Sequence, residues 1–263
     1  MSLRELRKHQ SGVTLVELLI VIVVSTAVTL AILAFALSFW SSTASLQNDL
    51  ETYVTRSDAG DRLRDYLNEA SGLISQNSIK DDHPMAPDSS DVSGQHWDVI
   101  HAVPKSIPIG AAGVMTPVIY FESPAIDTAK SIIMNGTQPY TNEFVLYLNG
   151  STKQLLLRSL ANPSATNNKT KTSCPNGFIT ASCPADRLIA DDISAVDTRY
   201  FSRSGNPIDY TSITDPLTGA YIGPDFTSVE VVELTLHLFR KSTIDNGQDT
   251  VNSTIVRVAI RNR

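Results

Sequence analysis

The chain has little positive charge, few aromatic side chains and almost no cysteine. Its 21 Lys and Arg are outnumbered by 27 Asp and Glu, which gives a formal net charge of -6, and 7% of its 263 residues are aromatic. Binding to a nucleic-acid backbone requires a basic face, so this balance disfavours that function. The 13 glycines and 13 prolines are close to average usage, which excludes a collagen and a wholly disordered chain.

Proline is absent between Val13 and Pro84, and charge is absent from residues 18–40. A helix over the uncharged run would rise about 35 Å, enough to cross the hydrocarbon core of a bilayer. Residues 1–12 contain three basic residues and one acidic residue, and an excess of positive charge ahead of an apolar run holds that end on the cytoplasmic side. We therefore expect a single membrane span at residues 13–40.

A secretory signal peptide is the alternative, because Ala34-Phe35-Ala36 resembles a small-residue cleavage site. The apolar run is, however, longer than that of a usual signal peptide. Glu17 is a second distinguishing feature, since an unpaired carboxylate at the start of such a run disfavours insertion. The pattern Thr14-Leu15-Val16-Glu17 offers a local partner, because it matches a helix capping box.

Residues 12–21 read GVTLVELLIV, and residues 1–12 form a short basic leader. This combination closely resembles the prepilin signal of type IV pilins and type II secretion pseudopilins. The resemblance implies that a prepilin peptidase cuts after Gly12 on the cytoplasmic face and methylates the new amine of Val13. It also implies that Glu17 neutralises the N-terminal amine of a neighbouring subunit during filament assembly, because two paired charges are tolerable in an apolar bundle.

Two further features concern the branch of this family. Many major pilins carry a proline in the membrane helix, and its absence is commoner among minor pilins and pseudopilins. Residues 188–207 and 255–263 look like the corresponding elements of J-type pseudopilins and W-type minor pilins. The resemblance therefore points to a minor pilin, with a type II secretion pseudopilin as the alternative.

The helix is expected to continue beyond the membrane as an amphipathic spine at residues 41–76. Small and apolar residues recur there at helical spacing, and charged residues occupy the opposite face, including the Asp58/Arg62 pair. Gly60 costs about 1 kcal/mol relative to Ala, which predicts a local bend or a close packing contact. The stripe consists of Leu46, Leu50, Tyr53, Gly60, Leu63, Leu67, Ala70 and Ile74.

Residues 77–263 are expected to form a β-rich head. Residues 77–95 indicate a loop whose four aspartates are solvated, because their order does not match a calcium-binding EF-hand. Beyond it, Asn149-Gly150 is a strong hairpin signal, and alternation near the C-terminus predicts an antiparallel sheet with one wet face. The predicted strands are residues 97–103, 118–122, 143–148 and 153–158, and the alternating runs are 232–238 and 256–261.

The two cysteines, Cys174 and Cys183, both stand in Ser-Cys-Pro contexts, and Pro175-Asn176-Gly177 is a turn that could bring them together. The predicted topology places them outside the cytoplasm, where a disulfide persists, and closing so short a loop would contribute about 2 to 3 kcal/mol. Two lone cysteines offer too few ligands for a metal, so the sequence favours a disulfide.

Catalytic motifs are missing, since the sequence contains no HExxH, GxSxG, GxxxxGK or CxxC. His96 and His101 are typical of ordinary surface or core histidines. We therefore expect no enzyme, no metal and no cofactor. Four Asn-x-Ser/Thr sequons are short enough to arise by chance. They begin at Asn135, Asn149, Asn168 and Asn252.

The sequence as a whole predicts an α+β subunit, in which a long N-terminal helix, transmembrane in its first half and amphipathic in its second, packs against an antiparallel β-sheet head. The predicted function is assembly of a filament whose core is a bundle of helices. The large head argues for a minor pilin that primes assembly or sits at the tip. Expected partners are other pilin or pseudopilin subunits, the prepilin peptidase and an inner-membrane assembly platform.

The expected location is the cytoplasmic membrane, with the short N-terminus inside and the head outside, and then an extracellular or periplasmic filament. A function of another class stays open, namely a membrane-anchored extracytoplasmic enzyme or binding protein with residues 18–40 as an uncleaved anchor. Such an anchor has no need of a glycine followed five residues later by an acid. Nucleic-acid binding is disfavoured by charge but stays open for a DNA-uptake pilus.

Overall fold

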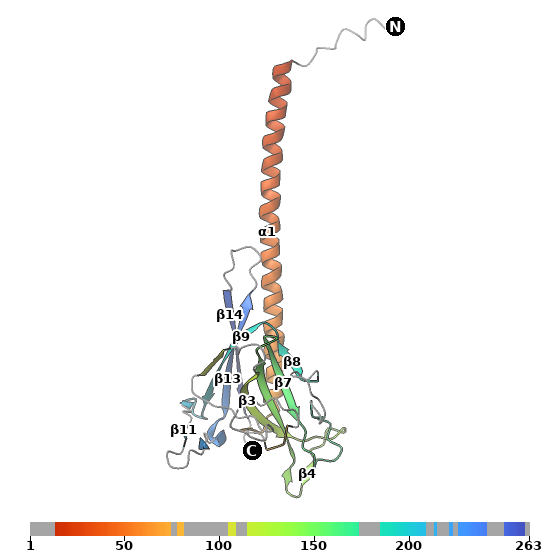
Figure 1. The fold of residues 1–263 in the computed structure, drawn as a ribbon, viewed down its shortest axis with the longest axis vertical. Helices are drawn as coiled ribbons and strands as arrows, with labels where there is room; N and C mark the ends of the chain where they lie inside the picture. The colour runs from red at the N-terminus through yellow and green to blue at the C-terminus, as the bar shows by residue number, and fades with distance from the viewer. Residues whose placement is uncertain are drawn as a thin grey trace, which may run out of the picture. The chain divides into compact units, whose positions relative to one another are not determined.

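A computed structural model describes residues 14–74, 78–81, 105–108, 115–173, 185–208, 213–214, 221–222, 226–240 and 250–260. The chain divides into two compact units, Met1–Glu51 and Thr52–Arg263. The first unit contains the apolar part of the long helix α1, and the second contains the rest of that helix and the described strands (Figure 1). The fold is α+β, as the sequence predicts.

Helix α1 begins at Leu15 and ends at Asn68 without a break. An uninterrupted helix is what the absence of proline predicts, because proline removes a backbone donor and clashes with the preceding turn. The prediction that the helix extends to residue 76 is wrong. At its end, Ala70 N donates to Leu67 O at 3.1 Å, a tighter bond that closes the last turn.

The chain leaves the helix because a sheet competes for its backbone. Ser71 N donates to Glu122 O at 2.8 Å, and strand β1 (Gly72–Ile74) then pairs with strand β3 (Met115–Pro124). Gly72 is a poor helix former, so the ladder of the sheet prevails over a longer helix. Ile74, which fits the helical stripe in the sequence, therefore belongs to a strand.

The first sheet has five antiparallel strands in the order β1-β3-β6-β7-β8. Its remaining strands are β6 (Thr141–Asn149), β7 (Gln154–Leu160) and β8 (Arg187–Ala190). The predicted runs 118–122 and 143–148 lie within β3 and β6, and most of 153–158 lies within β7. The predicted hairpin joins β6 to β7.

The turn of that hairpin is longer than the two-residue turns that Asn-Gly pairs most often form. β6 ends at Asn149, and residues 150–153 form the loop. The Asn149 side-chain oxygen accepts from Ser151 N at 2.9 Å, and Lys153, not Gly150, takes the left-handed conformation, with φ 56°. The asparagine therefore acts through its side chain, as in an Asx turn.

The second sheet has the order β10-β9-β13-β14, and β2 also pairs with β9. Alternate side chains of β13 are buried, which confirms the predicted sheet with one wet face. The predicted strand at 97–103 lies outside the described residues. The elements of this sheet are β2 (Lys105–Pro108), β9 (Ile193–Phe201), β10 (Pro207–Ile208), β13 (Val231–Arg240) and β14 (Thr250–Ala259).

Three small elements complete the described chain. Strands β4 (Met134–Asn135) and β5 (Gln138–Pro139) form a two-stranded hairpin between β3 and β6. Strands β11 (Ile213–Thr214) and β12 (Tyr221–Ile222) form another pair. A short 3-10 helix, η1 (Phe226–Ser228), precedes β13.

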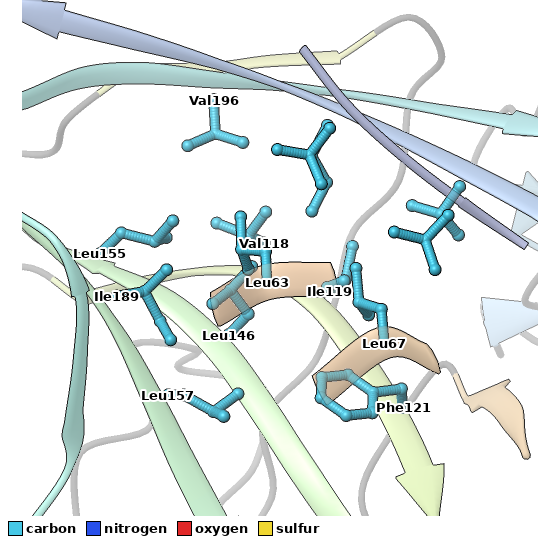
Figure 2. Packing of buried hydrophobic residues seen from close by; sticks show 14 of the residues in the cluster. Leu63, Leu67, Val118, Ile119, Phe121, Leu146, Leu155, Leu157, Ile189 and Val196 are labelled. Atoms are coloured by element: carbon cyan, nitrogen blue, oxygen red, sulfur yellow. The ribbon is translucent and has the colours of Figure 1, made fainter. Parts of the chain in front are cut away.

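Both sheets share one hydrophobic core with the part of α1 that lies in the second unit. In Figure 2, Leu63 and Leu67 of the helix lie among side chains of the first sheet such as Leu146, with Val196 of β9 across from them. Each buried leucine contributes about 1.5–3 kcal/mol relative to an exposed one. The helix therefore holds the two sheets together.

The predicted helical stripe is buried in its second half alone. Its buried members in the helix and just after it are Gly60, Leu63, Leu67 and Ala70, and its exposed members are Leu46, Leu50 and Tyr53. Exposed apolar side chains that gather on one face mark an interaction surface. Within α1 the stripe is therefore buried from Gly60 to Leu67, and its members from Leu46 to Tyr53 are exposed.

Gly60 lies against β14. A Cβ atom built on it would stand 3.6 Å from Val256 Cγ2, an ordinary van der Waals distance. The predicted close packing contact at Gly60 is therefore confirmed, and the contact leaves room for one methyl group.

Gly60→Ala should stabilise the head. The methyl group fits, and alanine is favoured over glycine in a helix by about 0.8–1 kcal/mol. The measurement is the urea unfolding midpoint of the full-length chain in detergent micelles. Gly60→Val is the matched control, because its branched side chain should overlap Val256 and lower the midpoint. A lower midpoint for Gly60→Ala would show that the helix and β14 are closer than described.

Candidate functional site

The first turn of α1 is closed by a reciprocal pair of side chains. Thr14 N and Thr14 Oγ1 both donate to Glu17 Oε2, at 2.9 and 3.0 Å, and Glu17 N donates to Thr14 Oγ1 at 3.3 Å. This is a capping box, which satisfies backbone N–H groups that have no partner within the helix. The local partner predicted for the Glu17 carboxylate is confirmed.

The helix that follows is long and apolar enough to cross a membrane. The candidate span is Leu15–Ala44, with a mean hydropathy of 2.9 in its most apolar window, and none of that window is buried inside the chain. At about 1.5 Å per residue the span rises roughly 45 Å, more than a bilayer's hydrocarbon core requires. A helix so apolar and so exposed needs lipid or other helices around it.

Three hydroxyl groups in the first half of the span bond to their own helix. Ser25 Oγ donates to Ile22 O at 3.0 Å, Thr26 Oγ1 to Ile22 O at 2.8 Å, and Thr29 Oγ1 to Ser25 O at 2.8 Å. A hydroxyl bonded to the preceding turn does not need water. These three side chains are therefore compatible with the interior of a bilayer.

In the second unit, the first sheet buries a charged cluster on the face opposite to the main core. Arg158 of β7 is fully buried, with its guanidinium 2.8 Å from Asp186 Oδ2 and 2.9 Å from Asp81 Oδ2. Tyr147 OH donates to Asp186 Oδ2 at 2.5 Å, and the Arg158 guanidinium carbon lies 5.4 Å from the Tyr147 ring centroid. The cluster holds the segments of Asp81 and Asp186, which are distant from one another in sequence, against the neighbouring strands β6 and β7.

This cluster keeps its protons in the folded head. Burial alone would lower the pKa of the Arg158 guanidinium, but the hydrogen bond and charge of Asp186 and the charge of Asp81 outweigh it and raise the pKa. Burial and the Asp186 carboxylate raise the pKa of the Tyr147 phenol. Arg158 thus stays a cation and Tyr147 a donor. Breaking such a buried pair costs about 3–5 kcal/mol, which points to a structural role.

The burial of Asp81 contradicts the expectation that the aspartates of residues 77–95 are solvated. Asp81 is 1% exposed and bonded to Arg158. The physical reason is that Arg158 follows three leucines on a buried strand, where an unpaired cation would be very costly. That position is a signal in the sequence that an acid must approach it, although nothing in the sequence says which one.

A pair of carboxylates lies on the same face, where β3 and β6 run side by side. Glu143 is buried and accepts from Ser78 N at 2.9 Å, from Ser78 Oγ at 2.5 Å and from Ile79 N at 3.0 Å. Glu122 stands directly opposite Glu143 in the strand register. Burial raises the pKa of the Glu122 carboxyl, a hydrogen bond from Thr141 lowers it, and the Glu143 charge raises it, with a net increase.

Within the described residues, no group of three or more His, Cys, Asp and Glu side chains could hold a metal ion. His237 Nε2 lies 2.8 Å from Asp197 Oδ2 on the outer face of the second sheet, without a third ligand in such a group. The sequence singled out His96 and His101 as well, and both lie outside the described residues.

The helix start and the first half of the span match a known family. Residues 7–33 match the prokaryotic N-terminal methylation motif, and this segment contains Gly12, Glu17, Ser25, Thr26 and Thr29. The chain carries the type IV pilin and pseudopilin signature. No curated protein and no solved structure matches the chain. The matched segment ends within α1, so the signature does not extend into the head.

The pilin signature supports N-terminal cleavage and methylation and a membrane-anchored chain. The residues predicted for cleavage and methylation, Gly12 and Val13, lie outside the described residues, as do Cys174 and Cys183. Glu17 is the one predicted site residue that the structure describes. Its carboxylate binds Thr14, which directly follows Val13 in the sequence.

Glu122→Gln should stabilise the head at neutral pH. Because the pKa of Glu122 is raised on folding, its contribution to stability is present below its unfolded pKa and is lost as the pH rises through the folded pKa. Glutamine cannot ionise, so the variant keeps its stability as the pH rises. It also removes the repulsion between the carboxylates of Glu122 and Glu143, a cross-strand contact worth about 0.2–1 kcal/mol. The measurement is the unfolding midpoint of the full-length chain in detergent from acidic to neutral pH, where the advantage of the variant should grow with pH.

Glu143→Gln is the matched control on the opposing strand. It removes a carboxylate that accepts three hydrogen bonds from residues 78 and 79, so it should lower the midpoint at neutral pH. An equal effect of both substitutions, or no dependence on pH for Glu122→Gln, would contradict this interpretation of the pair.

Proposed function

We propose that the chain is a minor pilin-like structural subunit of a type IV pilus and not an enzyme. The observation that carries the proposal is the methylation motif at residues 7–33 placed on an unbroken apolar helix, which leads directly into the core of a folded head. A helix of this kind anchors the subunit in the membrane before assembly. In the filament it joins the helices of neighbouring subunits.

In this proposal the prepilin peptidase removes residues 1–12 after Gly12 and methylates the amine of Val13. Residues 13–40 form the membrane and filament-core helix, and the amphipathic spine begins at residue 41. The N-terminus faces the cytoplasm because its basic residues favour that side, and the head lies outside. An inner-membrane assembly platform then transfers the subunit into the filament.

Glu17 has the geometry for two tasks at once. All the described hydrogen bonds of its carboxylate use Oε2, and among the described residues none uses Oε1. One oxygen therefore caps the helix while the other is available to a neighbour. We assign that second partner to the methylated amine of Val13 in an adjacent subunit, because a positive and a negative charge within an apolar bundle are stable only when paired.

The proposed disulfide between Cys174 and Cys183 is supported by the residues that flank it. Ser173 N donates to Ser159 O at 2.9 Å, and Asp186 binds Arg158. Ser159 and Arg158 are consecutive residues of β7, so the chain is fixed to one strand just before the first cysteine and just after the second. A loop whose ends are already close loses little further entropy when a bond closes it.

The pseudopilins of type II secretion systems share the signature and form the alternative within the family. The genes beside this one separate the two: a retraction ATPase indicates a pilus, and a secretin with exoproteins indicates a secretion system. A membrane-anchored enzyme or binding protein is the alternative of a different class. It predicts no role for Glu17 beyond the helix cap.

Glu17→Gln tests the proposed pairing. The amide can still accept from Thr14 and fits the same capping pattern, so processing and membrane insertion should be unchanged. The Val13 amine of a neighbour would lose its counter-charge, and breaking a buried pair costs about 3–5 kcal/mol. Incorporation into filaments should therefore fall by at least about a hundredfold. The measurement is an immunoblot of sheared filaments, normalised to the membrane fraction.

Glu69→Gln provides the control for loss of one acidic charge, since Glu69 is an exposed acid next to the head end of the same helix. It should assemble as wild type does. Equal recovery of Glu17→Gln and Glu69→Gln in filaments would leave helix capping as the whole role of Glu17.

A further inference from the structure

The β4–β5 hairpin presents an Asn-Gly pair to solvent. Asn135 ends β4, Gly136 and Thr137 form the turn, and all three are exposed. Gly136 has φ 64°, and no heavy atom outside the glycine and its two chain neighbours lies within 4 Å of the place where its Cβ would stand. The Gly136 backbone therefore carries no side chain, and the space beside its Cα is open.

The base of this hairpin is fixed, because Ile133 N donates to Ala125 O at 2.8 Å and Tyr140 N donates to Ile133 O at 2.9 Å. Little holds the tip beyond that base, where the two strands pair only at Met134↔Pro139 and Asn135↔Gln138. An isolated pair of short strands is marginally stable in water. The tip should therefore open locally at little cost, whatever the stability of the rest of the head.

We infer that Asn135 is a site of spontaneous deamidation. The deprotonated backbone nitrogen of Gly136 attacks Cγ of the Asn135 side chain, a carbon–nitrogen bond forms, and the bond from Cγ to Nδ2 breaks as ammonia leaves. Water then adds to either carbonyl of the cyclic imide. The product is aspartate or isoaspartate, and the step requires no enzyme, no oxidant and no cofactor.

The chain contains its own control. Asn149-Gly150-Ser151 has nearly the same local sequence as Asn135-Gly136-Thr137. Asn149, however, is buried, and its side-chain oxygen accepts from Ser151 N at 2.9 Å. It also pairs with both β3 and β7 inside the five-stranded sheet. Attack by Gly150 therefore requires opening of the sheet, which costs far more than opening of the tip.

Deamidation would change the surface of the head. Ile132 and Met134, each about half exposed, precede the asparagine, so a new carboxylate would appear beside an apolar part of the hairpin. Isoaspartate also adds an atom to the backbone at position 135, directly before the two-residue turn, which the strand register cannot accommodate without a shift. Older heads would thus differ from new ones in charge and shape at this hairpin.

The test is a time course on the full-length chain in detergent micelles at mildly alkaline pH. No Lys or Arg separates Asn135 from Asn149, so chymotrypsin, which cleaves after Tyr140, places them in different peptides for mass spectrometry. Asn135 should convert at least about tenfold faster than Asn149 in the folded chain. In concentrated urea the two rates should converge, because the local sequences are alike.

Asn135→Gln verifies the assignment, since it should abolish the mass shift in its own peptide and leave the Asn149 peptide unchanged. The two other Asn-Gly pairs, at Asn176 and Asn246, lie outside the described residues and occur in separate peptides. Equal rates for Asn135 and Asn149 in the folded chain would overturn the inference. A rate difference that persists in urea would overturn it too, because sequence and not the fold would then be its cause.

Discussion

The hydrogen bonds between Thr14 and Glu17 allow a carboxylate to stand at the beginning of an apolar helix. In lipid, each polar group without a partner is expensive, and this holds for the first backbone N–H groups of a helix as much as for an acid. In the capping box the Glu17 carboxylate accepts from Thr14 N, so the acid and a backbone N–H group at the helix start are each other's partners. The hydroxyl groups of Ser25, Thr26 and Thr29 meet the same requirement by bonding to their own helix.

The later part of helix α1 lies in the hydrophobic core of the head. In the unit that contains the head, Leu63 and Leu67 belong to one core with both sheets, so the anchor and the centre of the head are parts of a single covalent element. Apolar residues nearer the membrane, such as Leu50, are exposed. In the proposed filament, a bundle of such helices would cover those residues.

Patterns that depend on local physics could be predicted from the sequence. The unbroken helix followed from the lack of proline, and the one-sided sheet followed from the alternation in β13. Two details depended on contacts that are distant in sequence. The helix ends at Asn68 because Ser71 binds Glu122 of β3, and Asp81 is buried because Arg158 needs it. No periodicity or local motif contains this information.

In the candidate site, too, local features could be predicted from the sequence and contacts between distant segments could not. The motif around Glu17 is short and contiguous, so the sequence alone indicated its family and its cap. The charged cluster of Arg158, Asp81 and Asp186 is assembled from three separate segments and could not be predicted. In the described head, this buried cluster fixes Asp81 and Asp186 to Arg158 of β7.

The central claim of the proposal is that the mature chain begins at a methylated Val13, one residue before the capping threonine. The most direct measurement is intact-mass and N-terminal peptide analysis of the chain from membranes of its native host. We predict a chain that starts at Val13 with one added methyl group, and a full-length chain when Gly12 is replaced by leucine. An intact Met1 in the wild-type chain, or a start after Ala36, would contradict the claim.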